Sequence, residues 1–150
     1  MTGAYRRAGQ HALAALLLTS VHHAYGAYVY DTPWRYHVVL VSVPAAVMIL
    51  GALALLRVHP SWLPWRLTRG LLVLTILAVV LAIGAFEGGY NHAAKNLLYF
   101  GGAFPALTAR LFPAPTYVMP DNVFFEITGI AQVVPAALAA RHLYGTGSRN

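Results

Sequence analysis

The chain has no cysteine and little charge. The absence of cysteine excludes disulfides, thiolate metal sites, iron–sulfur clusters and cysteine nucleophiles. Only 9% of its 150 residues are charged, against about 25% in an ordinary soluble domain. Hydrophobic residues make up 59% of the chain, and its mean hydropathy is +0.61. These values exclude an ordinary soluble domain and predict a single transmembrane domain over residues 1–150, with the lipid bilayer as its main partner.

Acidic residues are especially scarce. There are four of them against ten Lys and Arg, which gives a formal net charge of +6. In a soluble protein this balance would suggest nucleic-acid binding, but no basic stripe here is interleaved with aromatic residues. Membrane proteins collect Lys and Arg at their cytoplasmic face. The basic balance therefore indicates how the chain is oriented in a membrane, and we expect no nucleic-acid partner.

Four segments are long and apolar enough to span a bilayer. They lie at about 10–30, 34–56, 67–88 and 123–143. The segment 91–112 carries Lys95, Pro105 and Arg110, and its uncharged part, residues 96–109, has only 14 residues, which is short for a span. We therefore predict an all-α integral membrane protein: a four-transmembrane-helix bundle plus a short interfacial or re-entrant helix at about 91–112. A genuine fifth span is the alternative.

The basic residues favour four spans over five. With four spans, seven of the ten basic residues share the side that holds both termini and the 57–69 loop. These residues are Arg6, Arg7, Arg57, Arg66, Arg69, Arg141 and Arg149. Five spans would divide the basic residues six against four. The positive-inside rule thus predicts that both termini are cytoplasmic, and we expect the chain to reside in a bacterial cytoplasmic (inner) membrane.

A carboxylate, Glu87, closes the longest apolar run of the chain, residues 71–86. Such a charge is costly in a membrane unless it is paired. Two glycines follow, which would let the backbone turn, and then His92. In the predicted topology each of the four helices offers at least one His or Glu near the same outer level, so a polar site that opens outward is expected. On the first helix, His22 and His23 lie about 100° apart, so we expect only one of them to point well into that site.

Imidazoles and carboxylates gathered in a helical bundle are typical of a transition-metal site. The candidate ligands, in order of preference, are His23, Glu87, His37, Glu126, His22 and His92. Neither His-Glu-x-x-His nor Glu-x-x-His occurs, so the prediction depends on a constellation and not on a motif. The expected metal is iron, copper or zinc, and the expected substrate is hydrophobic or delivered by the membrane.

Other readings of these residues stay open. A metal-free acid–base enzyme, of isomerase or hydratase type, would use Glu87, His23 and Tyr90 as catalytic residues on a lipid-soluble substrate. A small transporter, a haem held by His23 and His37, and an accessory subunit of a larger membrane complex are further alternatives, and the chain could also form a homo-oligomer. Lys95 is expected to contact lipid headgroups or a loop.

Overall fold

A computed structural model describes residues 3–58, 61, 63–114 and 116–147, and all regular secondary structure in these residues is helical. Four of the helical stretches are long and apolar enough to cross a membrane. They are Gly3–Val29, Pro33–Val58, Trp65–Phe100 and Val123–Gly145. The predicted class, an all-helical protein with four such helices and a shorter one, is confirmed, and this architecture fits an integral membrane protein.

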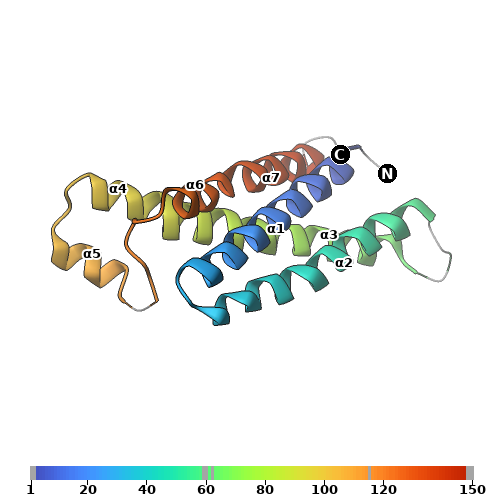
Figure 1. Ribbon diagram of the computed structural model, residues 1–150. Coiled ribbons are helices and arrows are strands. Elements are labelled where there is room, and N and C mark those ends of the chain that lie inside the picture. Colours follow the sequence, from blue (N-terminus) through green and yellow to red (C-terminus); the bar gives the residue numbers. More distant parts are fainter. Residues whose placement is uncertain (1–2, 59–60, 62, 115, 148–150) are drawn as a thin grey trace.

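The first two long stretches are nearly regular helices. They comprise α1 (Gly3–Val29), a 3₁₀ turn η1 (Pro33–Arg35) and α2 (Tyr36–Val58). Proline suits this turn because its fixed φ favours the first position of a helix. The turn continues directly into α2, so α1 and α2 form a helical hairpin (Figure 1).

The remaining stretches are built from consecutive pieces. The third comprises α3 (Trp65–Val79), a π-helical stretch η2 (Val80–Ala94) and α4 (Lys95–Phe100). After the short α5 (Pro105–Leu111), the fourth comprises α6 (Val123–Ala131) and α7 (Val133–Gly147). The start of α1, the end of α2, the start of α3 and the end of α7 lie at one end of the bundle, and α4 and α5 lie at the other (Figure 1).

Small residues on α1 allow its neighbours to pack closely. Ala8, Ala12 and Ala15 are fully buried and follow the i, i+4, i+7 spacing of one helix face. This face packs into a core that includes Ile49 of α2 and Ala139 of α7. Close approach through small side chains is a common way to join helices in membranes, where helix contacts gain little from the hydrophobic effect.

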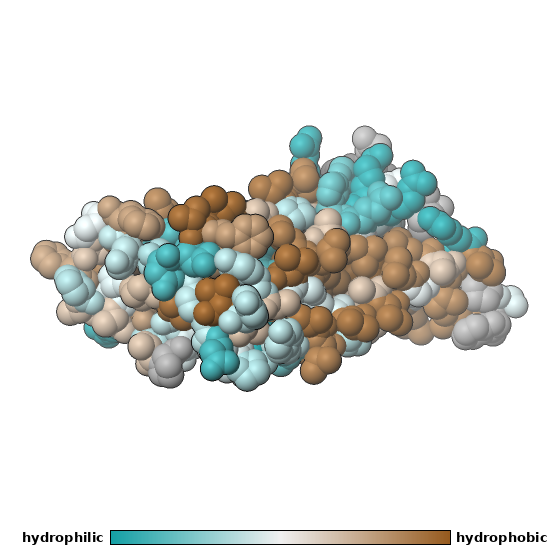
Figure 2. All heavy atoms as spheres, in the orientation of Figure 1, coloured by the Kyte–Doolittle hydropathy of each residue, from teal (hydrophilic) through white to brown (hydrophobic). Residues whose placement is uncertain are grey.

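The outside of the bundle is apolar. On α2, Leu40, Val47 and Leu50 are 72%, 63% and 55% exposed. Figure 2 shows hydrophobic side chains over much of the middle of one face, with hydrophilic ones gathered near the start of α1 and the end of α7. An apolar surface of this extent would be unstable in water, and it suits contact with lipid.

The third long helix was predicted to end near residue 88, but it continues to Phe100. The glycines at 88 and 89 stay helical and make no turn. At Gly88 an added Cβ would lie 2.8 Å from Val133 Cγ2, so the missing side chain lets α7 approach. The predicted helix at 91–112 is therefore divided. Its first part extends the third stretch, and its second part forms α5 after a turn at Gly102, whose φ is +73°.

Helix contact at Gly84 gives the first prediction. An added Cβ there would collide with Ala136 Cβ on α7, whereas the space around Gly51 in α2 is open. Gly84→Ala is expected to lower the free energy of unfolding by about 1–3 kcal/mol. The matched control, Gly51→Ala, should leave it unchanged or raise it by up to about 1 kcal/mol. Denaturation in detergent micelles measures both, and equal stability of the two variants would contradict this packing.

Candidate metal site

Three histidines converge on a single oxygen atom of Glu87. The Oε1 atom lies 3.6 Å from Nε2 of His22, 3.5 Å from Nε2 of His23 and 3.5 Å from Nε2 of His92. Within this set, the ligand atoms of His22, His23 and Glu87 all lie within 4.8 Å of one another and could hold a metal ion. We call these three residues the metal group. Its members come from α1 and η2, and all three side chains are largely buried.

The π-helical stretch brings Glu87 and His92 to the same side of their helix. In an α-helix, residues five positions apart point about 140° away from each other. In a π-helix the hydrogen bonds join residues i and i+5, so residues at this spacing lie nearly above one another. Because both residues belong to η2, their side chains reach one site. Such π-helical turns occur frequently at functional sites.

Both histidines of α1 reach Glu87, although the sequence predicted that only one would point well into the site. Their rings are tilted by 59° with centroids 5.1 Å apart. The Nε2 atoms of these two tilted rings lie 3.6 and 3.5 Å from the same Glu87 oxygen. The prediction was wrong because it assumed that the site lies directly in front of one face of the first helix, which only one of the two adjacent histidines could share.

The two oxygens of Glu87 have different surroundings. Asn91, one turn further along η2, donates from Nδ2 to Oε2 at 2.6 Å. The histidines are nearest to Oε1, at distances longer than the 2.7–3.2 Å that is usual for N–H···O bonds. Oε2 therefore has a hydrogen-bond donor in Asn91, whereas Oε1 faces three imidazole nitrogens.

The hydrogen bonds of His22 and His92 assign their protons. Thr128 donates its hydroxyl hydrogen to the Phe124 carbonyl at 2.8 Å, so its oxygen accepts from His22 Nδ1 at 3.0 Å. His92 Nδ1 lies 2.8 Å from Glu126 Oε2 and donates to it. A neutral imidazole carries one N–H, so in its neutral form each ring that donates from Nδ1 would leave the lone pair of Nε2 free to bind a metal. The His22 Nε2 atom and the His23 Nδ1 atom are buried without a hydrogen-bond partner among the described residues.

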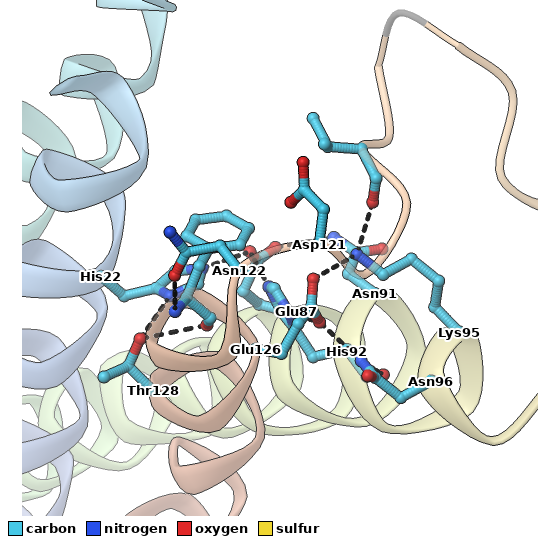
Figure 3. Close-up of polar contacts among 12 residues, drawn as sticks. His22, Glu87, Asn91, His92, Lys95, Asn96, Asp121, Asn122, Glu126 and Thr128 are labelled. Atoms are coloured by element: carbon cyan, nitrogen blue, oxygen red, sulfur yellow. Dashed lines mark hydrogen bonds and ion pairs between the residues drawn. The ribbon is translucent and has the colours of Figure 1, made fainter. Parts of the chain in front are cut away.

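Glu126 anchors a second polar cluster beside the metal group. Besides His92, its carboxylate accepts hydrogen bonds from Lys95 Nζ at 2.9 Å and Asn96 Nδ2 at 2.5 Å. Side chains from α1, from η2 and α4, and from α6 point toward one another in this region (Figure 3). Glu126 lies in the first turn of α6, and its contact with the metal group passes through His92.

Lys95 lies inside the protein, and not among lipid headgroups or in a loop as the sequence suggested. It is only 2% exposed, and Nζ also donates to the Val118 carbonyl at 2.7 Å. Lys95, Asn96 and Thr128 are the contributors that sequence reasoning missed. A usable signal was present: Glu87, Asn91 and Lys95 follow each other at intervals of four, as residues on one helix face do.

Two other predicted residues lie apart from Glu87. His37 stacks on Trp34, and its Nδ1 lies 2.6 Å from the Trp34 carbonyl oxygen. Tyr90 donates from Oη to the Leu111 carbonyl at 2.8 Å, so its hydroxyl is engaged with α5. His37 shares a cavity with Glu87, described next, whereas Tyr90 does not line that cavity.

A cavity of about 820 Å³ extends from the metal group between α2 and the α3–η2 helix. Most of its wall is apolar, with Val38 and Met48 from α2 and Leu74 from α3 among its lining residues. Its polar lining residues include His23, Arg35, His37, Glu87, Asn91, His92 and Lys95. The arrangement combines a largely apolar binding space with groups that can bind a metal or transfer protons.

A hydrogen bond between α1 and the segment before α6 lies near this region. Tyr30 donates from Oη to Asp121 Oδ1 at 2.5 Å. Burial raises the pKa of Tyr30, and the bond to the Asp121 carboxylate raises it further. Tyr30 therefore stays a neutral donor over the physiological pH range and ties the end of α1 to the residues that lead into α6.

The buried Lys95–Glu126 pair gives the second prediction. Lys95→Met leaves the Glu126 carboxylate without its cation, and breaking a buried pair in this way costs about 3–5 kcal/mol. The double variant Lys95→Met/Glu126→Gln removes both charges and should be less destabilised than the single one. Arg110→Met, which removes an exposed cation on α5, is the control and should change the free energy of unfolding by less than about 0.5 kcal/mol.

Detergent denaturation of the three variants beside the wild type tests this pairing. A Lys95→Met protein as stable as the Arg110→Met protein would contradict it.

Comparisons of the chain with protein-family models, with curated proteins and with solved structures give no significant match. The chemistry of the site is therefore the basis on which a function can be argued.

Proposed function

We propose that this chain is a membrane-embedded metalloprotein. Its His22, His23 and Glu87 side chains bind a transition-metal ion, and the site acts on a hydrophobic substrate delivered by the bilayer. One observation carries the proposal: three imidazole nitrogens surround one carboxylate oxygen at 3.5–3.6 Å. Ligand atoms that lie about 2.0–2.2 Å from a tetrahedral zinc ion are roughly 3.3–3.6 Å apart. The spacing around Glu87 Oε1 therefore suits ligands that share one ion.

Electrostatics supports a cation between these atoms. In the neutral tautomers that donate from Nδ1, the Nε2 atoms of His22 and His92 present lone pairs to a carboxylate oxygen, which repels them. A proton on one Nε2 atom could form a hydrogen bond with the Glu87 oxygen. The lone pairs of the other Nε2 atoms would still face that negatively charged oxygen. A metal ion would accept electron pairs from several of them at once.

The surrounding residues suit metal ligation. Metal-binding histidines usually donate their second N–H to a carboxylate, a carbonyl or a water, which fixes the ring and raises its basicity. His92 donates in this way to Glu126, and His22 donates to Thr128. His92 is therefore a candidate fourth ligand, with Glu126 orienting it. A mixed imidazole and carboxylate set favours iron, zinc or copper over magnesium or calcium.

The cavity supports a substrate that is delivered by the membrane. It is mostly apolar, and it meets the metal group at His23 and Glu87. A metal ion with an open coordination position polarises an oxygen atom of a bound substrate. We further propose that the start of α1 and the end of α7 face the cytoplasm, in a bacterial inner membrane, because most basic residues gather at that end.

Metal content gives the third prediction. Elemental analysis of detergent-purified wild type should find near-stoichiometric iron, copper or zinc. The variants His22→Gln/His23→Gln and Glu87→Gln should lose it by at least about 10-fold, because each removes ligands from the metal group. His11 and His142 stack on each other with centroids 5.3 Å apart, well along α1 and α7 from the metal group. His11→Gln and His142→Gln are therefore matched controls that should retain the metal.

A well-folded wild type without metal, even after reconstitution with each ion, would overturn the metal site. Equal metal content in the His22→Gln/His23→Gln and His142→Gln proteins would overturn the ligand assignment.

The second candidate is a metal-free acid–base enzyme. The observation that favours it is the chain of contacts from Lys95 through Glu126 and His92 to Glu87, which could hold and pass a proton. A metal-free protein would make this candidate the better one, and its activity should then be lost in Glu87→Gln.

A further inference from the structure

Arg35 is a buried cation without a counterion in the described part of the chain. Its exposure is 6%, and no Asp or Glu among the described residues forms an ion pair with it. Its Nε donates to Thr32 Oγ1 at 2.8 Å, and that is the one hydrogen bond of its side chain to a described residue. The guanidinium carbon lies 4.9 Å from the centroid of the Trp34 ring and 5.3 Å from that of Phe125. The two terminal nitrogens thus have no hydrogen-bond acceptor among the described residues, although Arg35 lines the cavity.

We propose that the cavity binds one long-chain carboxylate, with its carboxylate group on Arg35 and its chain between α2 and α3. The inference builds on the proposed function, because it names the class of substrate that would reach the metal group. A buried cation in a membrane needs a partner. A guanidinium binds a carboxylate through two parallel N–H···O bonds, which is the favoured geometry for such a pair. The carboxylate of Glu87 attracts Arg35 electrostatically but forms no ion pair or hydrogen bond with it, because its oxygens face Asn91 and the histidines.

The walls of the cavity suit an extended apolar chain. On α2, the residues that line it recur at helical spacing as Val38, Val41, Ala45 and Met48, on the face that begins at Arg35. At 1.5 Å per residue this face is roughly 20 Å long. Leu71, Leu74, Ala78, Ala82 and Phe86 line the opposite wall at similar spacing. The two walls form a slot that is apolar along its length and cationic at one end.

The volume and the rim of the slot favour one chain that enters from the bilayer. A volume of about 820 Å³ lies within the roughly 300–1,000 Å³ of pockets for single small molecules. Val41 and Leu74 line the slot and are also 64% and 68% exposed. The rim of the slot is therefore continuous with the outer apolar surface, so a lipid-soluble molecule can enter between α2 and α3 directly from the bilayer.

The carboxylate end of such a molecule would lie beside the metal group. Arg35, His23 and Glu87 all line the same cavity. Arg35 belongs to the turn η1 that joins α1 to α2, and His23 lies in the last two turns of α1. The part of the ligand that is presented to the metal is thus its carboxylate or the carbons next to it. The far end of the chain lies among the apolar residues.

Binding of two probes of equal chain length tests the inference, and this is the fourth prediction. Radiolabelled hexadecanoate and hexadecanol are titrated against the purified protein in detergent, with metal content measured on the same samples. Wild type should bind hexadecanoate at least about 10-fold more tightly than hexadecanol. Arg35→Leu should abolish this preference and keep its metal, whereas the control Arg110→Leu should keep both.

A second variant covers the case in which Arg35→Leu fails to fold. Ala78→Trp fills the slot away from Arg35 and should weaken both probes at least about 10-fold with unchanged metal content. A wild type that binds the two probes equally, or an Arg35→Leu protein that keeps the preference, would overturn the inference. A metal-free wild type that still prefers hexadecanoate would overturn the proposed metal site and leave this inference standing.

Discussion

The carboxylate of Glu87 sets the main constraint on this bundle. It lies inside a helix long and apolar enough to cross a membrane, where an unpartnered charge is costly. Asn91 satisfies one oxygen, and three histidines from two helices face the other. The π-helical stretch, the adjacent histidines of α1 and the close approach of η2 to α7 all serve to bring these groups together. Without the Glu87 carboxylate, the three imidazole rings would have no negatively charged group between them.

Charge balance links the metal group to the cavity. The largely buried Glu87 and the buried Glu126 carry two negative charges, and the buried Lys95 and Arg35 carry two positive ones, so these four side chains are formally neutral as a set. A divalent metal would add an excess of positive charge in a low-dielectric region, where such an excess is unfavourable. A bound carboxylate would reduce it. Metal and anionic ligand are therefore expected to favour each other's binding, and Lys95–Glu126 supplies a fixed neutral pair that holds His92 in place.

Hydropathy and the cost of buried charge were enough to predict the fold class and to single out Glu87 and His23. Neither hydropathy nor spacing indicates the π-helix, because Gly88-Gly89 is equally typical of a turn, and the predicted end of the third helix is therefore too early. Lys95 was misjudged for a related reason: a lysine beyond an apolar run usually marks a helix end at the membrane surface. Its burial depends on Glu126, which lies on another helix 31 positions away, and such a pairing appears only when the helices are packed.

The proposed metal site requires that several imidazoles and the Glu87 carboxylate share one metal ion. X-ray absorption at the K-edge of the bound metal measures this directly, by comparing the wild type with the His22→Gln variant. In the wild type we expect a first shell of nitrogen and oxygen at about 2.0–2.2 Å, with outer scattering from at least two imidazole rings that decreases in the variant. A first shell of oxygen atoms alone, or a spectrum that is the same in the two proteins, would contradict it.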